Sequence, residues 1–394
     1  MNTSLYKQEM EQELDSILAY WMQYTVDHER GGFFGKVNND NEADAHAEKG
    51  LVMNARILWA FSSAFNLTGT TDYLTIADRA YAYITDHFID TEHGGVYWSV
   101  DAEGKMLSDR KQVYGQAFCL YALAEYYQAT SVHAALEHAV RLFNLIEQHS
   151  FDPERLGYFE AFNRDWSPID DLRLSARDAN EKKTMNTHLH VIEAYANLYK
   201  VLPLPQVKER IEDLLEVFDQ HIIDPSTHHL VLFFDENWAV KSPLVSYGHD
   251  IEAAWLLQEA AEIIGEEKWI TKMKEWAIKI ADAAGEGLDD DDGLWYEYDP
   301  GADHLVKEKH SWPQAEAMIG FVNAWQVSGK EKYYKASYAS WEFVKEYIRD
   351  NKQGEWFWGV NDDYSPMAGQ DKAGFWKCPY HNSRACIEII RRLN

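Results

Sequence analysis

Two stretches of the sequence place a histidine three residues before a glutamate. MNTHLHVIEAY does so with His190 and Glu193, and SYGHDIEAAW does so with His249 and Glu252. Side chains three residues apart lie on nearly the same face of a helix, so each carboxylate could orient its imidazole and fix the tautomer. A single histidine at such a position would be interpreted more simply as a helix cap or as a solvated residue. The repetition favours general acid–base chemistry, for which an imidazole is well suited near neutral pH.

Other expected helix starts carry polar or aromatic residues of the same kind. SWPQAEAM places Trp312 four residues before Glu316, MNARILWAF contains Arg56, and His381 directly precedes the last helical stretch. If these helices converge, their inward side chains share one central pocket. We therefore expect one site built from several distant segments of the chain.

A metal site is a weaker interpretation of the same histidines. His188 and His190 would point about 200° apart on a helix, so they cannot both face one pocket. His190, His249 and His381 together could still ligate a metal ion. Proton transfer at a carbon atom is the preferred interpretation, and we expect neither a metal nor another cofactor.

The carboxylates leave a glycoside hydrolase open as an alternative. Glu316, Glu252 and Asp178 could supply the carboxyl pair which that reaction needs. Three candidate histidines exceed the needs of hydrolysis, so this interpretation ranks lower. The sequence contains no G-x-S-x-G, P-loop or G-x-G-x-x-G motif, and so gives no support for a serine nucleophile or a bound nucleotide.

Six short segments rich in glycine and aromatic residues recur at a spacing of roughly 60 residues. Each alternates aromatic with small or polar residues, as a short strand does, and lies beside a turn signal. The interval before the fourth segment is longer than the others. The segments are ERGGFFGKV from Glu29, EHGGVYWSV from Glu92, RLGYFEAFN from Arg155, HHLVLFFDENW from His228, DGLWYEYDP from Asp292 and QGEWFWGVN from Gln353.

Long stretches between these segments have helical periodicity, with apolar residues returning at i, i+3, i+4 and i+7. Helices are clearest over 50–69, 73–88, 113–130, 134–149, 188–202, 249–265, 268–285 and 312–329. Repeated units of two helices and a hairpin cannot bury their apolar faces alone, but a closed ring of six inner and six outer helices can. We predict an all-α fold, an (α/α)6 barrel with short β-hairpin segments between helices, as a single domain over residues 1–394. An open α-solenoid is less favoured because neither end of the chain looks like a polar capping repeat.

Composition restricts the partners and the compartment. A net charge of −28 argues against nucleic acid and anionic membranes as partners. The sequence has no signal-peptide pattern and no stretch apolar enough to span a membrane, and its three cysteines show no disulfide pattern. We therefore expect a cytoplasmic protein. The aromatic fraction of 14% suits stacking on sugars.

At these residues the sequence resembles the N-acylglucosamine 2-epimerase superfamily, and within it the cellobiose 2-epimerases. The resemblance covers nearly the whole chain from Trp21 onward. It is carried by MNARILWAF, QVYGQAF, RDANEKKTMNTHLHVIEAY, SYGHDIEAAWLL, HSWPQAEAM and FWKCPYHNSRAC. It implies a cofactor-independent inversion at C2 of the reducing-end sugar of a β-1,4-linked disaccharide such as cellobiose or lactose.

The resemblance also implies residue roles. His381 and His249 would be the acid–base pair at C2, His190 would serve ring opening, and Arg56 would contact the reacting end of the sugar. Trp255 is assigned to packing. The residues implied around the sugar are Tyr114, Asp178, Asn186, Glu252, Trp312, Glu316 and Trp376.

Several functional alternatives share this chemistry. A sugar opened to its aldehyde loses its C2 proton to give an enediolate, and reprotonation at C1 instead of C2 yields a ketose. An aldose–ketose isomerase is therefore the closest rival, followed by an epimerase of N-acylglucosamine. A non-catalytic sugar-binding protein would not need the paired His and Glu residues. We expect a small-molecule sugar as the partner, and a monomer or weak homodimer.

Overall fold

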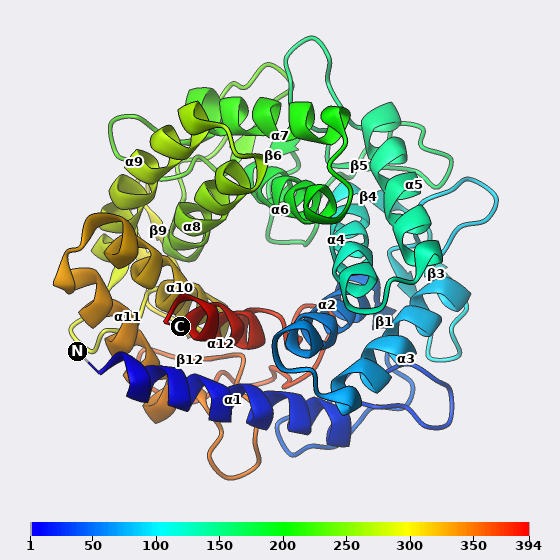
Figure 1. Ribbon diagram of the computed structural model, residues 1–394, viewed down its shortest axis with the longest axis horizontal. Helices are drawn as coiled ribbons and strands as arrows, with labels where there is room; N and C mark the ends of the chain where they lie inside the picture. Colours follow the sequence, from blue (N-terminus) through cyan, green and yellow to red (C-terminus); the bar gives the residue numbers. More distant parts are fainter. Residues whose placement is uncertain (1, 394) are drawn as a thin grey trace.

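The computed structural model describes residues 2–393, and twelve α-helices within them form two concentric rings (Figure 1). The inner ring consists of α2 (Leu51–Thr68), α4 (Val113–Thr130), α6 (Met185–Val201), α8 (Tyr247–Ile264), α10 (Ser311–Ser328) and α12 (His381–Arg392). The outer ring consists of α1 (Thr3–Tyr24), α3 (Thr71–His87), α5 (His133–His149), α7 (Pro205–Val217), α9 (Glu267–Ala284) and α11 (Glu331–Phe343).

The inner ring closes on itself. Each inner helix packs against the next in chain order, and α12 contacts α2, so the last helix meets the first (Figure 1). Helix α1 covers α12 from outside and completes the outer ring. This arrangement confirms the predicted (α/α)6 barrel and excludes the open solenoid. No helix between residues 2 and 393 is both long and apolar enough to cross a membrane.

The two rings differ in how their helices are buried. Helix α4 is buried at every position from Val113 to Tyr126, because it is covered by α2, α5 and α6. Helix α3 buries only one stripe, which includes Tyr73, Ala77 and Ile84. A helix that is apolar on all sides belongs in a core and an amphipathic one on a surface. This difference in sequence pattern assigns each helix to its ring.

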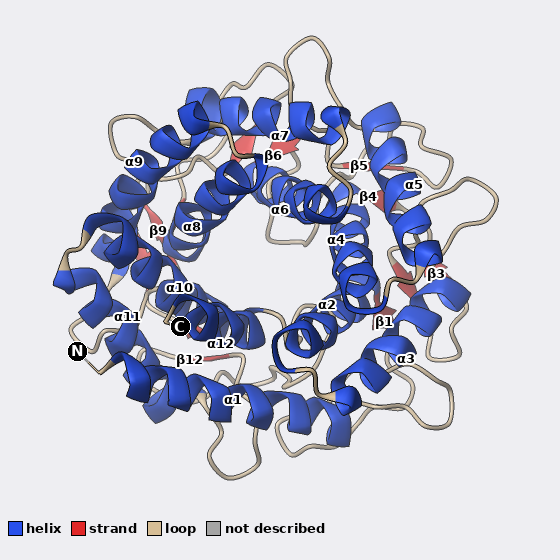
Figure 2. Ribbon diagram, in the orientation of Figure 1, coloured by secondary structure: helices blue, strands red, loops and turns tan. Residues whose placement is uncertain are grey.

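Short antiparallel strand pairs join neighbouring units at one end of the barrel (Figure 2). The two residues before an inner helix pair with a strand of the next unit. These pairs are β1 (Lys49–Gly50) with β2 (Ser99–Val100), β4 (Lys111–Gln112) with β5 (Ala161–Phe162), β6 (Lys183–Thr184) with β7 (Phe233–Phe234), β8 (Val245–Ser246) with β9 (Glu297–Asp299), and β11 (Lys309–His310) with β12 (Gly359–Val360). Two further strands, β3 (Met106–Ser108) and β10 (His304–Val306), extend the pairs of β2 and β9. A bridge between Val37 and Ala373 links the last unit to the first.

A buried lysine–aspartate pair recurs around this end of the barrel. In four of the five pairs the lysine stands two residues before an inner helix, and in all five the aspartate lies in the tight hairpin of the same unit. The fifth lysine, Lys372, lies nine residues before α12. One example is Lys111, whose Nζ lies 2.8 Å from Oδ2 of Asp90 with both side chains fully buried. In the fourth unit Val245 occupies the position of the lysine. The other pairs are Lys49–Asp27, Lys183–Asp152, Lys309–Asp289 and Lys372–Asp350.

The same pairs explain the long interval in the sequence repeat. Lys111 and Asp90 are 21 residues apart, whereas Lys183 and Asp152 are 31 residues apart. The extra residues fall in the loop 163–182 between β5 and β6, part of which reaches the central cavity.

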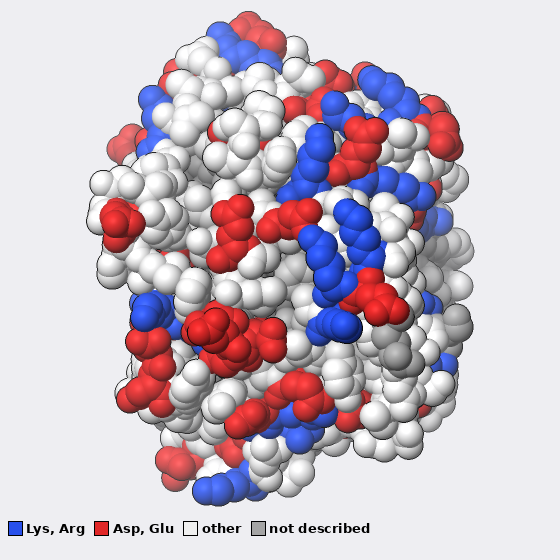
Figure 3. Space-filling view, turned by 90° about the vertical axis from the view of Figure 1, so that its left-hand side faces the viewer, with Lys and Arg blue, Asp and Glu red and all other residues white. Residues whose placement is uncertain are grey.

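Outside the barrel, the face shown in Figure 3 has acidic and basic side chains interspersed.

Candidate active site

A cavity of about 780 Å³ opens where the inner helices begin. Each of the six inner helices contributes at least one side chain to its wall, and the loop 172–179 borders it. Glu316 is fully buried behind this wall. The other residues that the sequence analysis assigned to catalysis or sugar binding all line the cavity: Arg56, Tyr114, Asp178, Asn186, His190, His249, Glu252, Trp312, Trp376 and His381.

Two of the three histidines are held by a carboxylate at Nδ1. In His190 this atom lies 2.9 Å from Oε2 of Glu193, and in His381 it lies 2.7 Å from Oε1 of Glu316. A carboxylate only accepts hydrogen bonds, so Nδ1 carries the proton and Nε2 is the basic nitrogen. No hydrogen bond to either Nε2 comes from residues 2–393. Both basic nitrogens are thus available to a ligand.

His249 is held differently from the other two. Its Nδ1 lies 2.8 Å from Oγ of Ser246, and Glu252 bonds to Nη2 of Arg384 at 2.5 Å instead. The expectation that Glu252 orients His249 is therefore wrong, although the equivalent expectation for His190 and Glu193 holds. A hydroxyl can donate or accept, so Ser246 leaves His249 free to adopt either tautomer.

Aromatic rings line the cavity beside the histidines. The Trp312 ring lies 4.7 Å from the His249 ring and 5.5 Å from the His381 ring, measured between centroids. His249 of α8 and His381 of α12 thus both lie beside the Trp312 indole, and all three line the cavity. Trp376 forms another part of the wall, 6.0 Å from the ring of Tyr114. Flat apolar faces with polar edges suit a pyranose ring.

Arg56 supplies a buried positive charge to the cavity. Its Nη2 donates to the hydroxyl of Tyr114 at 2.7 Å, and its guanidinium lies over the rings of Phe118 and Tyr380. Its Nε is buried and has no hydrogen-bond partner among the described residues. A guanidinium without a carboxylate partner is available to an anionic ligand atom.

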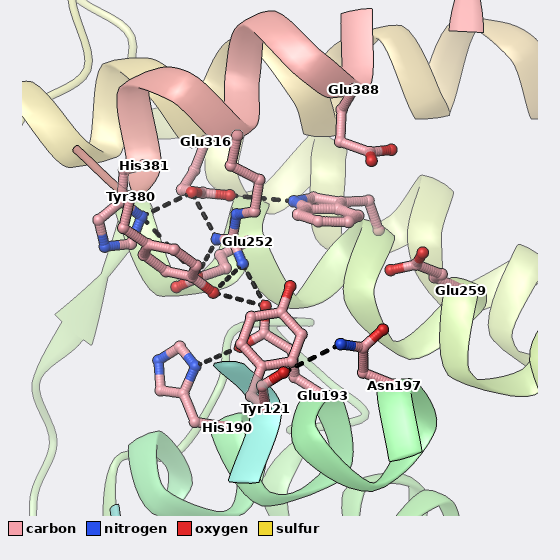
Figure 4. A network of polar contacts seen from close by, with 12 residues as sticks. Tyr121, His190, Glu193, Asn197, Glu252, Glu259, Glu316, Tyr380, His381 and Glu388 are labelled. Carbon is pink, nitrogen blue, oxygen red and sulfur yellow. Dashed lines mark hydrogen bonds and ion pairs between the residues drawn. The ribbon is translucent and has the colours of Figure 1, made fainter. Parts of the chain in front are cut away.

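Arg384 connects three carboxylates, two of which support histidines, and the three lie close together in Figure 4. Its Nη1 bonds to Glu193, and its Nη2 bonds to Glu252 at 2.5 Å and to Glu316 at 2.6 Å. The guanidinium is 1% exposed, so these bonds form in a region of low dielectric constant. Nε1 of Trp255 donates to Glu316 at 3.0 Å, so Trp255 does more than the packing assigned to it.

The histidines are neutral bases in this environment. Burial lowers the pKa of His249 to about 3 and holds the pKa of His381 well below its usual value, with the positive Arg56 and Arg384 adding to the effect on His381. Burial also lowers the pKa of His190. Burial would raise the pKa of Glu193, but the charge of Arg384 and the hydrogen bonds from His190 and Tyr380 together outweigh it and leave that pKa at about 2. Neutral imidazoles can accept a proton from carbon.

The two remaining predicted residues, Asn186 and Asp178, also line the cavity. Oδ1 of Asn186 is buried without a hydrogen-bond partner within the described chain, so it is available to a ligand. Asp178 lies on the inserted loop, where its Oδ2 accepts the backbone N–H of Ser175 at 2.7 Å. Asp178 therefore both stabilises the loop and lines the cavity.

A metal ion does not suit the acidic end of this site. Ligand atoms of Glu252, Glu316 and His381 lie within 4.8 Å of one another. Arg384 already bonds to both carboxylates, and Glu316 accepts from His381 as well. The guanidinium thus occupies the position from which a cation would neutralise the pair.

Comparisons with known proteins agree with this geometry. A profile of the N-acylglucosamine 2-epimerase family matches residues 32–385. The chain belongs to this family. It is 47% identical to the cellobiose 2-epimerase of Bacteroides fragilis, over 98% of this chain and 99% of that protein.

Two further proteins are similar to this chain over nearly their full length. The solved structure of the cellobiose 2-epimerase from Bacillus thermoamylovorans superposes with a TM-score of 0.93, at 40% identity and with 100% of both chains covered. The D-mannose isomerase of Marinomonas mediterranea is 23% identical over 98% of this chain and 97% of that protein.

Sequence reasoning missed three residues of this family member's site. Arg384 follows His381 by three residues, the same spacing that drew attention to His190 and Glu193, but an arginine in the first turn of a helix is ordinarily expected in solvent. Tyr380 donates to Glu193 at 2.5 Å across 187 residues of sequence, and no local pattern indicates that contact. Ser246 is the N-cap residue of α8, where a serine is expected to bond to the backbone rather than to His249.

Proposed function

We propose that this protein inverts the configuration at C2 of the reducing-end sugar of β-1,4-linked disaccharides, interconverting glucose and mannose units as in cellobiose and lactose. The observation that carries the proposal is the pair of neutral imidazoles, His249 and His381, facing one cavity on either side of Trp312. Inversion at carbon needs one group that removes a proton from one face and another that returns a proton to the other face.

Each residue has a role in this mechanism. The sugar opens to its aldehyde, a step assigned to His190, and the aldehyde makes the C2 proton acidic. Nε2 of His381 removes that proton from the glucose-configured sugar, and Glu316 stabilises the imidazolium that forms. Arg56 stabilises the enediolate oxygen. Rotation about C2–C3 presents the other face, and His249 returns a proton to it.

The size and lining of the cavity support a disaccharide. A volume of about 780 Å³ falls within the range of cavities that enclose drug-sized ligands. Tyr114, Asp178, Asn186 and Trp376 are assigned to the reacting sugar, and the inserted loop adds further wall to the same cavity. The identity of 47% to a cellobiose 2-epimerase, against 23% to a D-mannose isomerase, favours the disaccharide over the monosaccharide.

We also propose that the chain works as a single domain, in the cytoplasm, as a monomer or weak homodimer. The closed inner ring supports a single domain, because the helices at both ends of the chain take part in it. The absence of a disulfide pattern among three buried cysteines supports a reducing compartment.

Proton NMR in D2O tests the proposed reaction. The purified protein is incubated separately with cellobiose, lactose, glucose, mannose and N-acetylglucosamine. We expect the 2-epimer of cellobiose and of lactose, with deuterium at C2 and neither ketose nor free glucose. Ketose from mannose would move the function to an aldose–ketose isomerase, epimerised N-acetylglucosamine to the acylated sugars, and released glucose to a hydrolase.

A further inference from the structure

Three buried carboxyl groups meet in the centre of the barrel (Figure 4). Glu193, Glu252 and Glu316 are each at most 5% exposed, and all three bond to Arg384. Arg56 is the second guanidinium at this site, and it bonds to Tyr114 rather than to a carboxylate. Burying an uncompensated charge is strongly unfavourable. Two guanidinium groups can balance the charge of only two carboxylates. The third carboxyl group is therefore expected to be protonated.

The hydrogen bonds indicate which carboxyls are ionised. Glu193 and Glu316 each accept three hydrogen bonds, spread over both oxygens, and donors of this number stabilise the charged form. Glu316 accepts from His381 at 2.7 Å, from Arg384 at 2.6 Å and from Trp255 at 3.0 Å. Glu193 accepts from His190 at 2.9 Å, from Tyr380 at 2.5 Å and from Arg384.

Glu252 has far fewer donors. Its Oε1 accepts one hydrogen bond, from Arg384 at 2.5 Å, and Nδ1 of His381 is 4.0 Å away. None of the residues from 2 to 393 donates to Oε2 of Glu252, and this side chain lines the cavity. Glu252 is thus the carboxyl with the least support for a negative charge and the one that a ligand can reach.

The surroundings of Glu252 point the same way. Burial raises its pKa to about 8; the negative Glu316 adds to this rise, and Arg384 opposes it. Titratable and charged groups from the five other inner helices face this part of the site. They are Arg56 of α2, Tyr114 of α4, His190 and Glu193 of α6, Glu316 of α10, His381 and Arg384 of α12, and Tyr380 directly before α12.

We propose that Glu252 is a neutral carboxylic acid in the free enzyme and that it donates a hydrogen bond from Oε2 to the sugar oxygen that becomes negative when C2 is deprotonated. The proton stays on Glu252 throughout. An ionised carboxylate would repel that oxygen, whereas a neutral acid stabilises it, and Arg56 supplies the compensating charge. The hydrogen-bonding role deepens the proposed function and rests on it. The protonation state of Glu252 is independent of the proposed function.

Infrared spectroscopy of the wild-type protein tests the protonation state without substrate. In a pH titration from about 6 to 10 we expect the C=O band of a protonated carboxylic acid to disappear with a midpoint near 8. Burial also raises the pKa of Glu160 to about 8 and that of Glu297 to about 7, so the band of Glu252 is read from the difference between the wild-type and Glu252→Gln spectra. In the matched variant Glu316→Gln it should persist with a lower midpoint, because the neighbouring negative charge is gone. A wild-type minus Glu252→Gln difference spectrum without this band at about pH 6 would overturn the proposal.

Turnover tests the hydrogen-bond role. An amide keeps a neutral donor at this position, so Glu252→Gln should lose no more than about tenfold in C2 exchange near pH 7 and should lack the decline near pH 8 that the wild type shows. Glu316→Gln should lose at least about a hundredfold, because that carboxylate acts as an anion. Equal losses in the two variants, or a decline near pH 8 retained by Glu252→Gln, would refute the role. Absence of turnover in the wild type with the infrared band present would contradict the epimerase function instead.

Discussion

Replacing Glu316 by glutamine should slow proton transfer at C2 by about 10²–10⁴-fold with little change in KM. Glu316 lies behind the cavity wall and accepts Nδ1–H of His381 at 2.7 Å. A hydrogen bond to a charged group contributes about 1.5–3 kcal/mol, which the forming imidazolium would lose, and this alone slows the reaction about 10- to 150-fold. The amide can also present an N–H to Nδ1 and impose the tautomer that leaves no basic Nε2, an effect that costs about 10⁴-fold in serine proteases.

The assay is the rate of C2 deuterium incorporation in D2O, measured with kcat and KM separated. Trp255→Phe is the matched control, because it removes a donor to the other oxygen of Glu316 and leaves the carboxylate in place. We expect this control to lose less than about tenfold. A Glu316→Gln enzyme that keeps kcat within about fivefold of the wild type would refute the view that this carboxylate supports His381.

Three further predictions concern the groups around the site. Ser246→Ala removes the hydrogen bond at Nδ1 of His249 and should lower kcat by about two- to tenfold, and an unchanged kcat and pH profile would show that Ser246 does not position the ring. Lys183→Met leaves Asp152 buried without its ion pair and should destabilise the fold by about 3–5 kcal/mol in denaturant unfolding, against less than about 0.5 kcal/mol for the exposed Lys307→Met. His188 has a pKa lowered to about 3 by burial, so it stays neutral when folded while the unfolded chain takes up a proton below its ordinary value of 6.5. Stability should therefore fall by about 1.4 kcal/mol for each pH unit below that value, and His188→Gln should lose this part of the acid sensitivity in melting curves.

The fold could be predicted because its signals are local. Helix α4 was expected over 113–130 and spans Val113–Thr130, since continuous apolar periodicity marks a core helix wherever it stands in the chain. The equal spacing of the hairpins gave the number of units, and six units close a ring. Buried lysines stand two residues before four of the six inner helices, but a lysine is ordinarily expected in solvent.

The candidate site divides into local and distant contacts. The bond between His190 and Glu193 spans three residues and was predicted from helical spacing. The same spacing gave a wrong prediction for His249. Glu252 bonds to Arg384, which is 132 residues away in the sequence, and not to His249. Contacts of that range depend on how α12 closes the ring, which no single segment specifies.

Crossed isotope exchange tests the central claim most directly, namely that His381 and His249 serve opposite faces of C2. In D2O, His249→Asn should still exchange the C2 proton of cellobiose but form no epimer, because His381 can remove and return a proton on one face only. His381→Asn should exchange the C2 proton of the mannose-configured epimer but not that of cellobiose. Epimer formed by either variant at a rate within about tenfold of the wild type, or loss of both exchange reactions in both variants, would contradict the account.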